Sequence, residues 1–331
     1  MGLDVYSRRK YKQGKFVYLL DEEEKTAWIA KGHIGRCRRY RLPDHVMVDG
    51  QRYTVESVEA GAYNRPRTLR HLVIPDTFNY VDEWAFLCNN LRSVYIGKGL
   101  DYLDSWTFCH CNKPRIFHID KDNPYLKYEN GMVLSKDGKT LWSAYIECSH
   151  VIIPKGVEEI KGIAFLDNQY LESVTFPKTL RKMGDNSFGN CPKLCRVQLP
   201  EGFEKFRVQS FFENMNLSYV DLPSTLTDLG YMTFADCPNL ETVVLRSPKK
   251  LEFGNCFKAY LHDEPMIKAK LYVPADLVEQ YKQDPEWGVF KHILPIQKKP
   301  LIIETDEAMH KELMRIMREI AENEIEDLSN E

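Results

Sequence analysis

Apolar and polar residues alternate in short segments that recur along most of this chain. In one such segment the apolar residues Leu171, Val174 and Phe176 are separated by polar ones, and Met183 and Phe188 follow as further apolar positions. This alternation predicts a short strand with one side facing a core. A single segment cannot bury its apolar side alone, whereas stacked copies can, so the pattern predicts a repeat solenoid.

The strand segments follow the pattern L-x-x-V-x-I-P. The copies are Leu69–Pro75, Leu91–Gly97, Leu171–Pro177, Leu194–Pro200, Leu217–Pro223 and Leu240–Arg246, with degenerate copies at Pro114–Asp120 and Cys148–Pro154. The last four regular copies start 23 residues apart, a period typical of leucine-rich repeats. We therefore expect a leucine-rich-repeat solenoid of mainly β and loop structure, with a parallel sheet of short strands on one face, hairpin caps and a C-terminal helix.

Both ends of such an array need caps. Residues 1–68 are expected to form two capping hairpins and a first irregular repeat, with strands at Phe16–Leu20, Thr26–Ile29, Val46–Val48 and Tyr53–Val55. The dipeptide Asp49-Gly50 is typical of a type I′ turn. The repeats are expected over residues 69–270, with a hairpin insert at about 121–147. Residues 271–297 are expected to form the C-terminal cap, with a short helix at Ala275–Gln283, and residues 298–331 a linker and an acidic amphipathic helix.

Two further positions recur in the later copies. An aromatic residue follows each strand at Phe165, Phe188, Phe211, Phe234 and Phe257, and three residues later come Asn168, Cys191, Asn214, Cys237 and Tyr260. Stacked repeats would place each aromatic ring against its neighbours. The Asn and Cys side chains are expected to bond buried loop backbone.

The sequence resembles the BspA-like leucine-rich repeat family in several places. Residues 83–88, 161–165 and 230–237 are similar to the I-G-x-x-A-F-x-x-C element of that family. The insert at 130–141 and the ending at 272–290 also resemble segments of its members. The resemblance covers about residues 16–296. It implies a solenoid used in adhesion or host-protein binding, because members are mostly secreted or surface proteins of bacteria and some protists. It supplies no catalytic residue.

Charge is distributed unevenly along the chain. The 331 residues carry a formal net charge of −3, yet residues 1–70 contain fifteen Lys or Arg against nine Asp or Glu, and residues 301–331 contain three against ten. The basic run Arg36, Arg38, Arg39 and Arg41 is expected to be a solvated edge of the N-terminal cap. Because the rest of the chain has no excess of basic residues, no nucleic-acid partner is expected.

Signals for targeting are absent from the N-terminal sequence. Ser7–Lys10 precedes polar residues rather than an apolar segment, and no apolar run approaches the roughly 20 residues of a membrane span. The nine cysteines show no repeating framework, which favours reduced thiols. A cytoplasmic location is expected if Met1 is the natural start, and a secreted or cell-surface location if a signal sequence was removed.

The outward side of the predicted strands is the first candidate binding surface. Its most anchor-like residues are Tyr95, His118, Arg196, Gln198, Tyr219 and Asp221. The alternative is a solvated sheet face without a partner.

Two weaker candidates are an aromatic patch and a metal site. Trp84 and Trp106 occupy equivalent positions in adjacent repeats, where variable residues suggest exposure; the alternative is packing beneath the insert. The cysteines at 109–111 and 191–195 lack the two ligand pairs of a zinc site, so no metal is expected.

The C-terminal segment is predicted to form a helix over about residues 305–326. Met309, Leu313, Ile316 and Ile320 form an apolar seam suited to docking on the solenoid, to a partner or to self-association. As a hypothesis, this acidic segment contacts the basic run of the N-terminal cap in the same or a neighbouring chain.

No catalytic or cofactor-binding motif is present in the sequence. The chain is therefore expected to be a non-enzymatic scaffold that binds an unidentified protein through its strand face, without a cofactor. The alternative is a cell-surface adhesin or a component that binds glycans or host proteins.

Overall fold

Short strands followed by tight turns make up most of the chain, as the alternating pattern predicts. The computed structural model describes residues 8–64, 67–88, 90–101, 103, 105–108, 116–144, 146–258 and 267–296. Two units are distinguished: the first contains residues 1–137 and 142–145, and the second contains residues 138–141 and 146–331. None of the described helices is long and apolar enough to cross a membrane.

The first unit begins with hairpins. Its first sheet contains β1 (Arg9–Gln13), β2 (Phe16–Asp21), β3 (Thr26–Lys31), β6 (Gln51–Val58) and β5 (His45–Val48), in that order, with β9 (Tyr80–Val81) beside β6. The predicted pairs β2–β3 and β5–β6 are antiparallel. Asp49 and Gly50 have φ angles of 51° and 81°, which agrees with the predicted type I′ turn.

A second sheet of the first unit contains its repeat strands, in the order β12-β11-β8-β4. The predicted strands are β8 (His71–Ile74), β11 (Ser93–Ile96) and β12 (Ile116–Ile119), which pair in parallel. Beside β8 lies β4 (Arg39–Arg41), also parallel. We expected this basic run to be a solvated edge of the cap; its four arginines are exposed, and β4 is the edge strand of this sheet, where it continues the ladder of the repeats. Shorter elements are β7 (Tyr63–Asn64), β10 (Phe86–Leu87) and the 3-10 helix η2 (Ser105–Phe108).

The insert is larger than a hairpin. In the first unit, β13 (Leu126–Glu129) and β14 (Met132–Ser135) are antiparallel, and β15 (Thr140–Ala144) neighbours β14. In the second unit, Thr140 and Leu141 of β15 pair in parallel with β17 (Glu159–Ile160). The insert therefore also supplies a strand to the ladder of the repeats.

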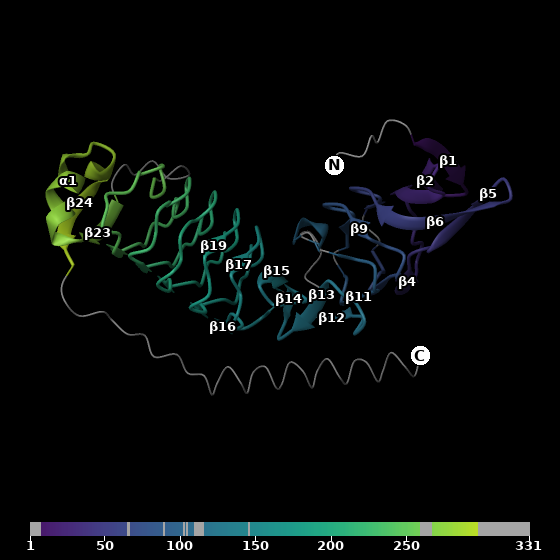
Figure 1. The fold of residues 1–331 in the computed structure, drawn as a ribbon, viewed down its shortest axis with the longest axis horizontal. Helices are drawn as coiled ribbons and strands as arrows, with labels where there is room; N and C mark the ends of the chain where they lie inside the picture. Colours follow the sequence, from purple (N-terminus) through teal and green to yellow (C-terminus); the bar gives the residue numbers. More distant parts are fainter. Residues whose placement is uncertain are drawn as a thin grey trace. The chain divides into compact units, whose positions relative to one another are not determined.

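A seven-stranded parallel sheet forms one side of the second unit. Its strands, in order, are β16 (His150–Ile152), β18 (Ser173–Thr175), β20 (Arg196–Gln198), β21 (Tyr219–Leu222), β22 (Thr242–Leu245), β23 (Ile267–Val273) and β24 (Phe290–Pro295). A smaller ladder contains β17 and β19 (Lys182–Met183) and continues as single bridges to Lys205 and Asp228. Figure 1 shows the turns of this unit following one another, from teal to green, towards β23.

Stacked aromatic rings fill the core of the second unit. Phe188 is fully buried, and its ring centroid lies 4.6 Å from that of Phe165 and 5.1 Å from that of Phe211. The stack continues to Phe234 at 5.5 Å and to Phe257 at 5.4 Å, with nearly parallel rings. The predicted packing of one aromatic per turn is confirmed.

Buried amide groups hold the loops together. The Nδ2 of Asn214 donates to the carbonyl oxygens of Phe188 and Phe211 at 3.0 and 2.8 Å, and its Oδ1 accepts from the Cys191 backbone N–H at 2.9 Å. The Cys191 thiol donates to the Phe165 carbonyl at 3.3 Å. The predicted role of the Asn and Cys ladder is confirmed for these residues, while Tyr260 lies outside the described residues.

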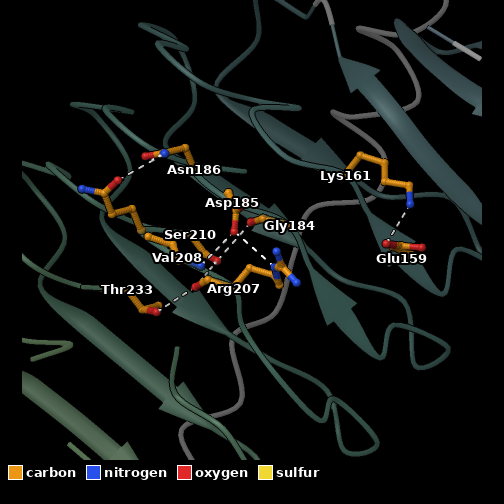
Figure 2. A network of polar contacts seen from close by, with 10 residues as sticks. Glu159, Lys161, Gly184, Asp185, Asn186, Arg207, Val208, Ser210 and Thr233 are labelled. Carbon is orange, nitrogen blue, oxygen red and sulfur yellow. Dashed lines mark hydrogen bonds and ion pairs between the residues drawn. The ribbon is translucent and has the colours of Figure 1, made fainter. Parts of the chain in front are cut away.

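Polar side chains on the loops also connect neighbouring turns, as Figure 2 shows. Asp185 accepts from Arg207 Nε at 3.3 Å and from the Val208 backbone N–H at 3.0 Å. Ser210 and Thr233 donate to backbone carbonyls of the preceding turns, at 3.1 and 3.4 Å. These contacts join residues 22 to 26 positions apart, about one repeat, so we assign them to the stacking of the solenoid rather than to a site.

The predicted C-terminal cap closes the aromatic stack. It contains η3 (Ala275–Leu277), α1 (Val278–Gln283) and η4 (Trp287–Val289). The Trp287 side chain is fully buried, and its Nε1 donates to the Leu251 carbonyl at 3.1 Å. Phe290 lies 5.2 Å from Phe257, edge to face. The sequence did not indicate that β24 extends the parallel sheet.

Truncation of a ring in the middle of the stack tests its importance. We expect Phe188→Ala to lower the free energy of unfolding by about 3–5 kcal/mol, because both flanking rings lose their contact and a cavity remains. Tyr170→Ala, which removes a 47% exposed ring, should change it by less than about 0.5 kcal/mol. Urea denaturation of both variants measures the difference, and equal effects would contradict the role of the stack.

Candidate functional site on the strand face

The seven-stranded sheet of the second unit has one constant side and one variable side. Register-matched positions on the inner side are all aliphatic: Val151, Val174, Val197, Val220, Val243, Leu271 and Ile293. The outer side, which we call the strand face, has two rows. These are His150, Ser173, Arg196, Tyr219, Thr242, Lys270 and His292, and then Ile152, Thr175, Gln198, Asp221, Val244, Tyr272 and Leu294.

A polar network occupies the middle of the strand face. Arg246, immediately after β22, donates from Nε and Nη2 to the two carboxylate oxygens of Asp221 at 2.7 and 2.8 Å. The Tyr219 hydroxyl donates to the same carboxylate at 3.3 Å. The Arg196 guanidinium lies over the Tyr219 ring, 5.0 Å from its centroid. Paired donors to one carboxylate fix the orientation of both groups.

Protonation states in this network follow from burial and from the paired charges. Burial, followed by the negative charge of Asp221, raises the pKa of the Tyr219 hydroxyl. The hydrogen bonds to Asp221 raise the pKa of the Arg246 guanidinium. The tyrosine therefore remains a hydrogen-bond donor and the arginine a cation at neutral pH.

Beyond the polar network, the strand face becomes more apolar but keeps the exposed Lys270 and His292. Val244, Tyr272 and Leu294 are neighbours in one row, and Leu294 is 36% exposed. Lys270 and His292 are neighbours in the other row, and both are exposed. Aromatic residues such as Tyr272 are enriched in protein interfaces.

Four of the predicted site residues come together on β20 and β21. Arg196 and Gln198 are partly exposed, whereas Tyr219 and Asp221 are only 8% and 2% exposed. We expected all four to be accessible anchors, and this is wrong for Tyr219 and Asp221. They point to the strand face but are covered, because Arg196 packs across the tyrosine ring and Arg246 pairs with the carboxylate.

The sequence-based site omitted Arg246 and the four residues on β23 and β24. A signal existed for Arg246, since it replaces the proline that ends most other strand segments. Lys270, Tyr272, His292 and Leu294 gave no such signal, because β23 and β24 depart from the 23-residue spacing and only the pairing of strands places them on this face.

Tyr95 and His118 are direct neighbours on β11 and β12 of the first unit. Tyr95 is 38% exposed, and its hydroxyl donates to Asp120 Oδ2 at 2.8 Å. This hydrogen bond raises the pKa of Tyr95. His118 is partly buried. Their role in binding stays a prediction.

Trp84 and Trp106 contact each other edge to face, with ring centroids 5.8 Å apart. Trp84 is 43% exposed, while Trp106 is partly buried. We attributed the variability of this position to exposure, which is clear for Trp84 and partial for Trp106. The equivalent residues Gly61, Trp84, Ile163, Asn186, Gln209, Met232 and Asn255 all have positive φ.

The remaining candidates lie partly outside the described residues. Among the residues that the structure describes, no group of three or more His, Cys, Asp or Glu side chains could hold a metal ion. The cysteines at 109 and 111 fall outside this part of the chain, as do the seam residues Met309, Leu313, Ile316 and Ile320. The seam remains a prediction.

Comparison with known proteins gives a family match and similar folds. The family model described as BspA type leucine-rich repeat region matches six copies, over residues 51–129 and 139–260. The comparison with curated proteins gives no match. The crystal structure of the pneumococcal vaccine antigen PcpA has 15% identity over 88% of this chain and 99% of that chain, with a TM-score of 0.54. A leucine-rich repeat protein from Bacteroides ovatus ATCC 8483 has 17% identity over 86% of this chain and 76% of that chain, with a TM-score of 0.51.

Removal of the Asp221 charge tests the polar network. We expect Asp221→Asn to lower the free energy of unfolding by about 2 kcal/mol, because two hydrogen bonds to a charged acceptor are weakened and Arg246 loses its counter-ion. Gln198→Ala, a partly exposed neighbour in the same row, should have an effect below about 0.5 kcal/mol. Thermal or urea unfolding of both variants measures these effects. An unchanged stability of the Asn variant would show that the network contributes little to the free energy of unfolding.

Proposed function

The chain belongs to the BspA-type leucine-rich repeat family, and we propose from this premise that it binds a partner protein on the strand face of its second unit. Leucine-rich repeat families are typically non-enzymatic scaffolds, and stacked repeats provide an extended surface on which each turn contributes a few side chains. The proposed binding residues are Arg196, Gln198, Lys270, Tyr272, His292 and Leu294.

One observation carries this proposal: the sheet keeps an aliphatic inner side while its outer side changes from strand to strand. The inner positions from Val197 to Leu271 are uniform because each packs against the next turn. Outer positions meet no such requirement, yet they combine the exposed Lys270 and His292 with Tyr272 and the exposed Leu294. Aromatic residues and arginine dominate binding energy in protein interfaces.

The buried pair of Asp221 and Arg246 supports the proposed surface indirectly. It holds Tyr219 in place beneath Arg196, and therefore fixes the guanidinium that a partner would meet. A preorganised arginine loses less conformational entropy on binding than a mobile one. We therefore assign Tyr219 and Asp221 a positioning role and Arg196 a contact role.

The proposal is tested by measuring how strand-face substitutions change partner affinity. The full chain is used to capture a partner from an extract of its source cells, and the purified partner is then titrated against variants. Arg196→Ala and Tyr272→Ala should each weaken binding by about tenfold or more. Tyr231→Ala is the matched control, because this tyrosine is 47% exposed but lies outside the strands.

Unchanged affinity in both strand-face variants would exclude this surface. If no protein is captured while the chain binds immobilised glycans, the adhesin alternative gains support. The variants should retain the thermal unfolding midpoint of the wild type, because both side chains are partly exposed and neither belongs to the aromatic stack.

A further inference from the structure

Three arginines occupy equivalent positions at the starts of neighbouring strands of the first unit. Arg38 precedes β4, Arg70 precedes β8 and Arg92 precedes β11. The Arg70 backbone N–H donates to the Arg38 carbonyl, and the Arg92 backbone N–H donates to the Arg70 carbonyl, both at 2.7 Å. Adjacent strands lie about 4.8 Å apart, so the three residues form a closely spaced row, which we call the arginine ladder.

The repeat fold does not require arginine at this position. In the second unit the equivalent residues make the same backbone hydrogen bonds, and they are Ser149, Glu172, Cys195, Ser218 and Glu241. Like charges on neighbouring strands destabilise a sheet, so a row of three arginines is unfavourable unless negative charge lies against it. The ladder therefore indicates a surface that meets an anionic group.

No acidic side chain of the described residues neutralises the ladder. Arg38, Arg70 and Arg92 form no ion pair with a described carboxylate. Arg38 and Arg92 are exposed, and Arg70 is partly buried. In the adjoining row of the sheet, His71 Nδ1 and Ser93 Oγ lie 2.8 Å apart and share a hydrogen bond. The charge of the ladder is therefore available to a ligand.

Acidic side chains lie at the opposite ends of the strands in this sheet, where they already have partners. Asp76 accepts from the Lys98 backbone N–H at 3.1 Å, and Asp122 pairs with Lys98 Nζ at 3.0 Å. Asp120 accepts from the Tyr95 hydroxyl at 2.8 Å. A strand of four residues is about 13 Å long, so these carboxylates do not contact the ladder.

We infer that the arginine ladder binds an acidic helix of a partner protein. Arginine binds carboxylates through two parallel hydrogen bonds and keeps its charge at neutral pH. Two strand intervals place the outer arginines about 9.6 Å apart along the ladder. In a helix, carboxylates at positions i, i+4 and i+7 lie on one face and span about 10.5 Å, whereas three on one side of an extended segment span about 13.6 Å. The helix therefore matches the ladder better.

Nucleic acid fits the ladder less well than an acidic helix does. Single strands are held by aromatic side chains on which bases stack, and neither the ladder nor the adjoining row of Arg39, His71 and Ser93 has an exposed aromatic ring. Affinity for a duplex grows with the number of phosphates that are neutralised. A row of three arginines suits a short acidic segment instead.

Binding of two synthetic peptides to the full chain tests this inference. Both peptides are alanine-rich, identical in composition and about 20 residues long, so that they form helices. Glutamates stand at i, i+4 and i+7 in the one-face peptide, and at i, i+2 and i+5 in the spread peptide. Fluorescence anisotropy gives the affinities at about 0.01 M salt, where the screening length is about 30 Å. The wild type should bind the one-face peptide roughly tenfold more tightly, because only this peptide reaches all three arginines at once.

Removal of the ladder charges should abolish this preference. A ladder variant carrying Arg38→Gln, Arg70→Gln and Arg92→Gln should bind the one-face peptide roughly tenfold more weakly than the wild type. Its thermal unfolding midpoint should be unchanged or higher, because repulsion between neighbouring strands is removed. The difference in binding should disappear at about 1 M salt, where the screening length falls to about 3 Å.

A matched control removes the same charge elsewhere in the first unit. It carries Lys12→Gln, Lys31→Gln and Arg52→Gln, at exposed positions outside the ladder. This control should bind the one-face peptide as the wild type does. A loss of affinity as large as that of the ladder variant would show that net charge alone governs binding, and it would overturn the inference.

Equal affinity of the wild type for the two peptides would also overturn the inference. A lowered unfolding midpoint of the ladder variant would do the same, because the arginines would then serve the stability of the sheet. Tighter binding of a single-stranded oligonucleotide of equal charge would assign the ladder to a polyanion instead. None of these outcomes bears on the proposed function, because the ladder belongs to the first unit and the proposed partner surface to the second.

Discussion

The stacking of one aromatic ring per turn is the interaction on which the second unit depends. Ring centroids from Phe165 to Phe257 lie 4.6 to 5.5 Å apart, which brackets the spacing of about 4.8 Å between hydrogen-bonded strands. Because both spacings agree, the strands can pair in constant register while the rings remain in contact. This register then decides which residues share a row on the strand face.

The turns around each ring show how the stack is supported. Residues two positions before and two positions after the aromatic have positive φ, as at Asn186 and Asn190 around Phe188. This conformation is unfavourable for most residues other than glycine, at about 1–2 kcal/mol. It is tolerated because the backbone N–H of the aromatics from Phe165 to Phe234 bonds to the next turn, as Phe188 does to the Ser210 carbonyl at 2.8 Å. The loop backbone therefore forms a ladder of its own, and side chains as different as Ile163 and Met232 occupy equivalent places.

The inward-facing residues of the solenoid are uniform, whereas its outward-facing residues vary. The two units differ in the residues that they place on their outer surfaces. In the second unit, Asp221 and Arg246 neutralise each other, while Arg196 is partly exposed and Lys270 and Leu294 are exposed. In the first unit, arginines recur at a position where the second unit has serine, cysteine or glutamate. Since the same backbone geometry accepts all of these residues, their differences reflect what each surface meets rather than what the fold needs.

The sequence by itself determined the repeat architecture, because each turn must bury the same apolar and aromatic side chains and therefore displays them at a regular period. Leu171, Val174 and Phe188 predicted both the strand and the stack, and Asn214 predicted the bonded loop. Only the tertiary structure showed that Asp221 is covered by Arg246, because their contact joins residues 25 positions apart across neighbouring strands. It also decided that β4 extends the repeat sheet and that β23 and β24 complete the strand face, since these strands lack the repeat spacing and are placed by hydrogen bonds to their neighbours.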